Sequence, residues 1–406
     1  MLLVAGSLRF VCVLAGLIVV GCGSALLGAV DNGTLKGKVL CGYQGWFSCG
    51  GDGARVGWTH WSKERWKGVE PGLAKFDLWP DMSEYSAAEL FSSNHPATVR
   101  RHFRWMREYG IDGAMVQRFP VDFPDTVWSR RVDRVLSHCR EAAIAEGRTY
   151  SVMYDLSGMR GGGFEIVAQD WRALRERLRI GADASYQHHR GKPLVGIWGV
   201  GFNDGRDYTL GDCRRLIERL RAEGCAVLLG VPTWWREQRN DASADPDLPA
   251  VLRLADVISP WSVGRYRSPD EARNHGDKVW RPDVEWCERE GSVCLPVVFP
   301  GFSWHNLRNG PLDDIPRHKG EFLWSQFLAA QRAGARMVYV AMFDEVDEGT
   351  AIFKCTNDPP TDGIQRFLTY EGLPGDFYLR LVGEGGRLLR GERDKEMPRI
   401  MYLMEF

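Results

Sequence analysis

Short apolar runs alternate with longer amphipathic stretches along the chain from residue 36 onward. The runs are rich in Val, Ile, Leu and Tyr, and they occupy residues 38–43, 113–117, 150–154, 193–198, 225–230, 257–261, 294–299 and 336–342. Runs that are apolar throughout, without polar alternation, are typical of parallel strands that are covered on both faces. We therefore expect eight buried strands of a parallel sheet.

The stretches between these runs show the spacing of helices. Residues 96–109 place Val99, Phe103 and Met106 on one face and arginines on the other, and Gly110 follows as a stop signal. Residues 210–221 and 320–331 are similar. Eight strands that alternate with helices over about 340 residues predict a single-domain (β/α)8 TIM barrel. An open doubly wound sheet is the alternative, but the Gly-rich phosphate turn that usually follows its first strand is missing. We expect the barrel domain at residues 36–385 and a C-terminal tail at 386–406.

The first 30 residues differ from the rest of the chain. They carry one basic residue, Arg9, then an apolar run over residues 10–20, and no acidic residue precedes Asp31. This order is typical of a secretory signal peptide, and the run is shorter than the roughly 20 residues of a membrane span. We therefore expect an exported protein, located in the periplasm or at the cell surface.

The end of this segment, Val19-Val20-Gly21-Cys22, resembles a bacterial lipobox. Cleavage before Cys22 would make that cysteine the site of a lipid anchor. Ordinary cleavage near Ala29 and an uncleaved N-terminal anchor are the alternatives.

Charge and cysteine content exclude several classes of function. The chain has 52 basic and 53 acidic residues, so it has no basic surplus for a nucleic-acid backbone. No Cys-x-x-Cys pair occurs, and we expect neither a metal site nor a cofactor. Cys41 and Cys49 bracket a turn and are the best candidates for a disulfide in an oxidising compartment. Five other cysteines are expected to be small buried residues, namely Cys139, Cys213, Cys225, Cys287 and Cys294.

The active site of a TIM barrel lies at the C-terminal ends of its strands. Aromatic, amide, arginine and carboxylate residues follow the predicted strands, which is the composition of a carbohydrate site. The candidate substrate-binding residues are Tyr43, Gln44, Trp46, Gln117, Arg118, Tyr154, Asp155, Trp198, Asn203, Trp234, Trp261, Arg265, Tyr266, Trp304 and Asp344. A salt bridge to a nearby arginine is the alternative for Asp155. Neutralisation of neighbouring acids is the alternative for Arg118 and Arg265.

Strand eight runs into the acidic segment 343–350, which contains Glu345 and Glu348. Glycoside cleavage normally needs two carboxyl groups, one of them protonated near neutral pH. If the chain turns tightly before Gly349, a pair three residues apart lies about 5–6 Å apart. That separation fits retention of anomeric configuration. A solvated acidic loop and a calcium site are the alternatives.

The segment Phe343-Asp-Glu-Val-Asp-Glu-Gly-Thr350 resembles the Asn-Glu-Trp-x-Glu-Gly-Thr stretch of family 99 glycoside hydrolases, the endo-α-mannosidases and endo-α-mannanases. The stretch Gly42-Tyr-Gln-Gly-Trp46, at the end of strand one, also resembles the first strand of that family. The chain looks like the family 71/99-like proteins exported by polysaccharide-degrading bacteria as well. Asp344 and Val346 depart from the family pattern, which has asparagine and tryptophan there.

The resemblance implies a role for each glutamate. Glu345 would take the proton of the sugar 2-hydroxyl, which attacks the anomeric carbon, and Glu348 would be general acid and then general base. The expected function is an exported, retaining glycoside hydrolase that cleaves an α-linked, mannan-like glycan. An exo-glycosidase on xylose- or arabinose-type glycans and a non-catalytic, glycan-binding surface lipoprotein are the alternatives.

Overall fold

The computed structural model describes residues 29–86, 90–161, 163–360 and 363–396. One sheet contains the strands β1 (Val39–Tyr43), β2 (Gly113–Arg118), β3 (Thr149–Asp155), β4 (His188–His189), β5 (Lys192–Trp198), β6 (Ala226–Pro232), β7 (Val257–Trp261), β8 (Val293–Cys294), β9 (Val297–Val298) and β10 (Val338–Val340). Its order is β8-β7-β6-β5-β3-β2-β1-β10-β9, and β4 is an antiparallel addition to β5. All the other pairs are parallel, as expected from the apolar runs.

The sheet closes into a (β/α)8 barrel because β8 and β9 share one position in the ring. Both belong to the predicted run 294–299, and Leu295 and Pro296 separate them. β8 pairs with β7, whereas β9 pairs with β10. Pro296 has no N–H to donate, so the pairing is interrupted at this residue. All eight predicted strands are therefore present, and the seventh is divided in two.

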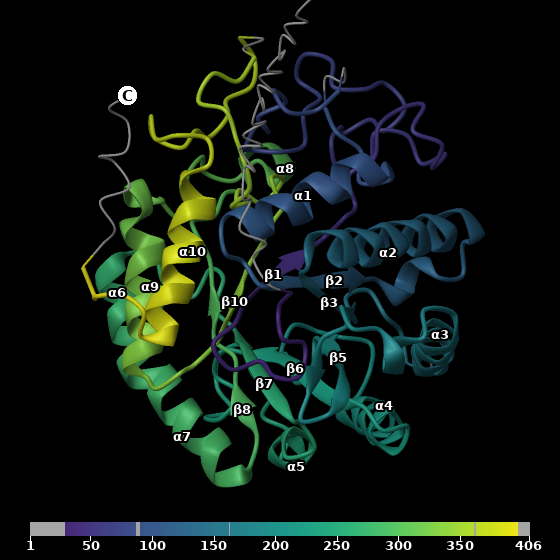
Figure 1. The fold of residues 1–406 in the computed structure, drawn as a ribbon, viewed down its shortest axis with the longest axis vertical. Coiled ribbons are helices and arrows are strands. Elements are labelled where there is room, and N and C mark those ends of the chain that lie inside the picture. Colours follow the sequence, from purple (N-terminus) through teal and green to yellow (C-terminus); the bar gives the residue numbers. More distant parts are fainter. Residues whose placement is uncertain (1–28, 87–89, 162, 361–362, 397–406) are drawn as a thin grey trace, which may run out of the picture.

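Helices surround the strands (Figure 1). The α-helices are α1 (Pro96–Glu108), α2 (Thr126–Glu146), α3 (Phe164–Arg177), α4 (Leu210–Ala222), α5 (Leu248–Leu252), α6 (Pro269–His275), α7 (Arg281–Glu290), α8 (His305–Arg308), α9 (Glu321–Arg332) and α10 (Phe377–Arg390). Single turns of other helix types lie at Pro120–Asp122, Ile180–Ala182, Gly276–Trp280 and His318–Gly320. The helices predicted at 96–109, 210–221 and 320–331 correspond to α1, α4 and α9.

Local sequence signals explain where several helices begin and end. The Asp125 carboxylate accepts hydrogen bonds from the first backbone amides of α2, and Gly147 ends that helix with a φ of 61°. Thr209 and Asp212 form a capping box at the start of α4. α10 lies beside α9 and ends at Arg390, so the helix crosses the domain boundary expected at residue 385.

Two long segments build a layer at the C-terminal end of the barrel. Their described parts, 44–86 with 90–95 and 341–360 with 363–376, contain no helix and only isolated bridges. Such bridges join Leu78 to Leu368 and Pro80 to Cys355. Long segments without regular structure inside a compact domain are usually functional. Here they stand over the strand ends, where the candidate site was predicted.

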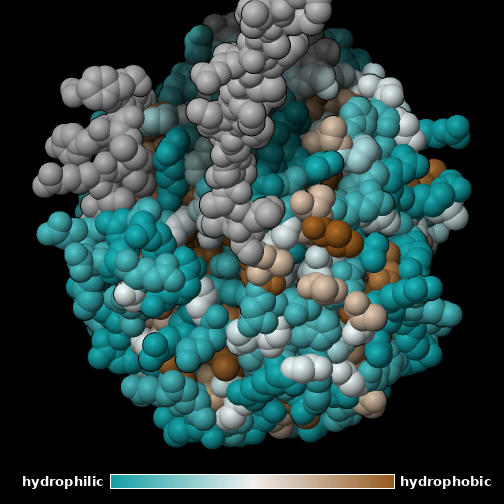
Figure 2. All heavy atoms as spheres, viewed as in Figure 1, coloured by the Kyte–Doolittle hydropathy of each residue, from teal (hydrophilic) through white to brown (hydrophobic). Residues whose placement is uncertain are grey.

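Most large apolar side chains are buried in one continuous core that includes the barrel strands. The face seen in Figure 2 is mainly hydrophilic, with hydrophobic residues in small groups among polar ones. Single exposed apolar residues are ordinary on a folded protein. In the described part of the chain, no helix is long and apolar enough to cross a membrane.

The expected disulfide between Cys41 and Cys49 is not formed. Cys41 is a free, buried thiol within β1. The Cys49 thiol instead donates to the carbonyl oxygens of Leu90 and Phe91, at 3.4 and 3.2 Å. The other five cysteines are buried, as predicted. Cys22 lies outside the described residues, as does the predicted signal peptide apart from residues 29 and 30.

Candidate active site

The loop after β10 carries both glutamates and turns sharply. Gly349 has a φ of 64°, and the backbone amides of Thr350 and Ala351 both donate to the Glu345 carbonyl at 3.1 Å. A side chain at position 349 would approach Leu368 and Ser303 to 3.0–3.2 Å. The turn that Gly349 predicted is therefore present, and glycine is the residue that fits it.

Neighbouring segments hold this loop in place. The buried Arg317 guanidinium donates from Nη2 to the carbonyl oxygens of Gly349 and Ala351, both at 2.8 Å. The backbone amide of Ser303 donates to the Glu348 carbonyl at 2.9 Å. These contacts fix the backbone at Glu348 and in the residues that follow it, so its carboxyl group is carried by a rigid support.

The loop is not a solvated acidic segment. Glu345 is 4% exposed, Asp347 is 1% exposed, and Glu348 is half-buried. Isolated acidic side chains are almost never buried in this way without partners. In the described residues, no group of three or more His, Cys, Asp and Glu side chains is arranged to hold a metal ion.

Two donors fix the Glu345 carboxylate. Gln44 Nε2 donates to Oε1 at 2.6 Å, and the Thr350 hydroxyl donates to Oε2 at 2.7 Å. Burial raises the pKa of Glu345 well above its usual value, and the charges of Glu348 and Asp347 add to this effect. The hydrogen bonds from Thr350 and Gln44 act in the opposite direction because they stabilise the charged form.

Glu348 has the properties of a proton donor near neutral pH. Burial raises its pKa to about 7, and the Asp347 charge contributes in the same direction. The Trp304 side chain and Arg308 lower it, but less strongly. The charge of Asp155, at the end of β3, also raises this pKa, as the smallest of these causes.

The sequence places His60 in a loop, residues 58–61, that could fold over the pocket, but a structural role was preferred for it; the structure places it at the site. Its Nδ1 lies 2.8 Å from Asp347 Oδ2, and its ring stacks on Trp46 with centroids 3.9 Å apart and planes 4° apart. Burial holds the pKa of His60 well below its usual value, so the neutral ring donates from Nδ1 to Asp347. The φ of His60 is 63°, an uncommon value for a residue other than glycine.

Three predicted substrate-binding residues point away from the barrel axis. The Tyr43 hydroxyl pairs with His102 Nδ1 at 2.8 Å, and the Tyr154 hydroxyl donates to Asp170 at 2.7 Å. Arg118 is buried and forms ion pairs with Asp170 on α3 and Asp133 on α2. These predictions were wrong because successive side chains of a strand point to opposite faces. Each of the three has a neighbour on the site face.

Those neighbours are Gln44, Gln117 and Asp155. Gln44 binds Glu345, as described above, and Gln117 Nε2 donates to the Tyr339 hydroxyl at 2.9 Å. Asp155 is half-buried, and its Oδ1 accepts from the backbone amide of Ser157 at 2.8 Å. No salt bridge to Asp155 occurs within the described residues, contrary to the alternative considered for it.

Aromatic residues occupy the rim beyond Asp155. Trp198 meets Trp261 edge-to-face, with ring centroids 5.4 Å apart, and Trp304 is 41% exposed beside Glu348. Trp234 is half-buried, with the Arg239 guanidinium stacked over its ring at 3.5 Å. Rings that are partly open to solvent can stack on the apolar face of a sugar.

The remaining predicted residues differ in role. Asn203 is exposed, and Arg265 forms an ion pair with Asp241 at 2.7 Å, as its alternative interpretation stated. Tyr266 is buried in an aromatic cluster, and its hydroxyl donates to Gln326 at 3.0 Å, so it belongs to the core.

Asp344 holds the backbone after β1 in place beside the site. Its two carboxylate oxygens accept from the backbone amides of Gln44 and Gly45, at 2.8 and 2.9 Å. Because both oxygens are occupied, Asp344 positions the β1 loop, and the expectation that it contacts substrate was wrong. Burial raises its pKa to about 7.

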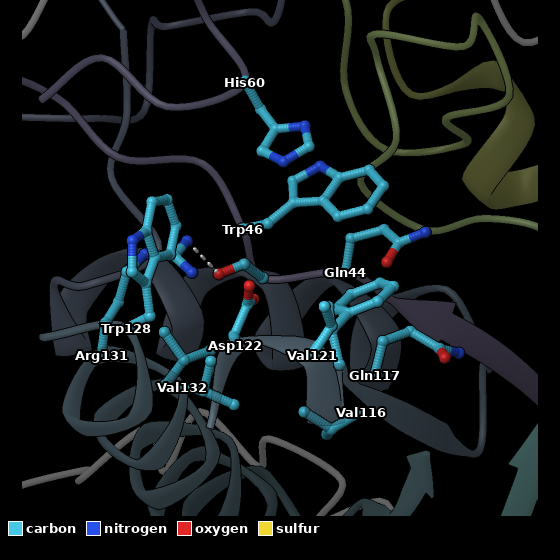
Figure 3. Close-up of a pocket in the computed structure, with 13 residues that line it drawn as sticks. Gln44, Trp46, His60, Val116, Gln117, Val121, Asp122, Trp128, Arg131 and Val132 are labelled. Carbon is cyan, nitrogen blue, oxygen red and sulfur yellow. Dashed lines mark hydrogen bonds between the residues drawn. The ribbon is translucent and has the colours of Figure 1, made fainter. Parts of the chain in front are cut away.

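A cavity of about 210 Å³ lies beside this loop (Figure 3). Gln44 and Gln117 stand at one end, Trp128 and Arg131 at the other, and Trp46 with His60 covers it. The cavity therefore extends from the partner of Glu345 toward helix α2.

The closed ring and the acidic site at its C-terminal edge define a (β/α)8 barrel with a carboxylate pair on the loop after the last strand. No family model matches the chain, and no curated protein matches it. Several solved structures share its fold.

A family 99 endo-α-mannosidase from Bacteroides thetaiotaomicron is 17% identical, with a TM-score of 0.65. The match covers 89% of this chain and 99% of that one, or 88% and 98% in its complex with bis-tris propane. A glycoside hydrolase-like protein is 13% identical over 89% of this chain and 97% of that one, with a TM-score of 0.55. The likeness to family 99 that the acidic motif predicted is thus found again in the fold.

Proposed function

We propose that the protein is a retaining glycoside hydrolase that cleaves an α-linked, mannan-like glycan with Glu345 and Glu348. The observation that carries this proposal is the pair itself: a buried carboxyl, Glu345, and a half-buried one, Glu348, on one rigid turn at the C-terminal edge of the barrel. A glycan-binding protein without catalytic activity would have no need to hold two like charges on one rigid turn.

The surroundings of the pair favour different roles for the two glutamates. Gln44 and Thr350 direct hydrogen bonds at both oxygens of Glu345, which favours its ionised form. Glu348 has fewer donors around it, and its pKa of about 7 allows it to carry a proton near neutral pH. This division matches the roles that the resemblance to family 99 implies.

The chemistry then follows in two balanced steps. Glu345 takes the proton of the 2-hydroxyl while that oxygen forms a bond to the anomeric carbon. The glycosidic bond breaks, and its oxygen takes the proton of Glu348. Glu348 next removes a proton from water, whose oxygen attacks the anomeric carbon. The bond between that carbon and the 2-oxygen breaks, and the 2-oxygen regains its proton from Glu345. Two inversions give net retention.

The substrate class and the location complete the proposal. The solved structure that shares this fold at a TM-score of 0.65 is an endo-α-mannosidase, which supports an α-mannan as the first substrate to test. The half-buried and exposed tryptophans at the rim support a glycan that extends beyond the cleaved bond. The basic and apolar pattern of residues 1–30 supports export, with a lipid anchor at Cys22 as the finer alternative.

The test is release of reducing sugar from α-mannan, α-glucan and arabinoxylan by the wild type, Glu345→Gln and Glu348→Gln. Glu288→Gln, which removes an exposed carboxyl on α7, is the matched control. We expect release from α-mannan by the wild type and the control, and none by either site variant. The anomeric form of the first product, followed by proton NMR, should be that of the substrate.

Three results would contradict the proposal. Full activity of Glu348→Gln would exclude it as the acid, and an inverted product would exclude the two-step chemistry. Binding of glycan without cleavage of any panel member would favour a binding protein.

A further inference from the structure

A second, strongly basic pocket lies next to the candidate active site. It has a volume of about 300 Å³ and is lined by Arg55, Arg130, Arg131 and Arg134, together with Val127 and the glycine-containing turn before Arg55. The positions on α2 are spaced by three and four residues, so they share one face of the helix. Four arginines therefore line one hollow.

These arginines have no carboxylate partner. Within the described part of the chain, none of the four forms an ion pair, and Arg134 donates only to the Asn94 side chain, at 3.2 Å. Arginines that line a similar hollow on α3 are different, because Arg172 and Arg175 pair with Glu165 or Glu223. Like charges so close repel each other, so the first cluster is suited to an anion from outside.

Arg131 is the buried member of the cluster, with 4% of its surface exposed. Its Nε donates to the Ser48 hydroxyl and its Nη2 to the Gly45 carbonyl, both at 2.9 Å. Its Nη1 has no partner among the described residues. Burial lowers its pKa to about 10, so it remains charged at neutral pH, and the charges of Asp52 and Asp122 act on it without forming an ion pair.

Arg131 also joins this pocket to the candidate active site. It lines both the basic pocket and the cavity of Figure 3. The Gly45 carbonyl that it binds belongs to the residue after Gln44, and Gln44 donates to Glu345. Arg131, which lines the basic pocket, is therefore connected to Glu345 through two neighbouring residues, Gly45 and Gln44.

We propose that the four arginines bind a sulfate or phosphate ester carried by the glycan substrate. Guanidinium groups recognise tetrahedral oxyanions through paired N–H donors, and four of them exceed what a single uronate carboxylate needs. The anion site itself follows from the geometry. That the anion is a substituent of a glycan rests on the function proposed above.

The test uses calorimetry at constant ionic strength with four probes: inorganic sulfate, inorganic phosphate, neutral α-mannan oligosaccharides and the same oligosaccharides after sulfation. The variant is Arg130→Gln/Arg134→Gln, which spares the buried Arg131 and changes two exposed residues. The control is Arg172→Gln/Arg175→Gln on α3, which removes the same charge from the paired cluster.

The wild type and the control should bind the sulfated oligosaccharide at least about tenfold more tightly than the neutral one, and the α2 variant should lose that difference. Equal affinity for both glycans would overturn the proposal. Binding of the inorganic anions alone would overturn the assignment to a glycan substituent, and equal losses in both variants would reduce the effect to net charge. Because these are binding measurements, absence of hydrolysis would overturn the proposed function and leave the anion site standing.

Discussion

Asp347 should set the pH range in which the protein is active. Its carboxylate is buried beside Glu348 and is the main charge that raises the Glu348 pKa. Asp347→Asn removes this charge and keeps the shape, and the new amide oxygen can still accept from His60 Nδ1, now 2.8 Å from Asp347. The variant therefore isolates an electrostatic effect on the general acid.

The magnitude follows from the pKa of Glu348. Burial and Asp347 together raise it from 4.5 to about 7, and burial is the larger cause. Removing the Asp347 charge, which is the smaller cause, should lower the pKa of Glu348 by about one unit, equivalent to about 1.4 kcal/mol. A general acid must be protonated, so activity falls as the pH rises through its pKa. The decrease in activity at high pH should consequently begin about one pH unit lower in Asp347→Asn than in the wild type.

The assay is kcat/KM for α-mannan hydrolysis between pH 4 and 9, which reports the free enzyme. Asp122→Asn is the control, because Asp122 lies at the cavity beside Arg131 and does not act on Glu348. An unchanged falling limb in Asp347→Asn, with activity retained, would refute Glu348 as the group that titrates there.

Three further outcomes are expected. Thr350→Val removes the donor to Glu345 Oε2 and should lower kcat by about tenfold or more, the worth of one hydrogen bond to a charged group, whereas Thr350→Ser should restore most of it. Arg317→Met removes the donor to the buried Gly349 carbonyl and leaves the Ala351 carbonyl with only the Tyr370 hydroxyl at 3.3 Å, so it should reduce the free energy of unfolding by about 1–3 kcal/mol in urea titrations. Tyr154→Phe breaks a hydrogen bond to Asp170 outside the site, so it should lower Tm with kcat unchanged; a specific loss of kcat would return Tyr154 to the substrate.

The barrel was accessible to sequence reasoning because its signals are local. Each strand is a continuous apolar run, and helices such as α2 and α4 carry their caps within a few residues. The interruption at Pro296 is local too, because this residue has no N–H to donate to its neighbour. The expected Cys41–Cys49 disulfide failed for a spatial reason, since Cys41 lies inside the barrel strand β1.

The candidate site was predicted only in part, because the residues at the end of each strand were all assigned to the site, whichever face of the sheet their side chains occupy. Position after a strand identified Gln44, Gln117 and Asp155, but it also included Tyr43 and Tyr154. Side chains alternate between the two faces of a strand, so one residue known to face the site would have separated Gln44 from Tyr43 and Asp155 from Tyr154. The local sequence placed His60 in a loop that could cover the pocket, but it could not show the contact with Asp347, which joins segments 287 residues apart in the chain.

The burial of the acidic loop argues that its function, and not its stability, determines its sequence. Burial raises the pKa of Asp344, Asp347 and Glu348 to about 7 each, so ionising them at neutral pH opposes folding. The fold offsets this cost with fixed donors: backbone amides for Asp344, His60 for Asp347, and Gln44 with Thr350 for Glu345. Glu348 alone has no such set of donors. A loop selected for stability would place its least satisfied acid in solvent, whereas this one places it half-buried on a rigid turn, where a proton donor is needed.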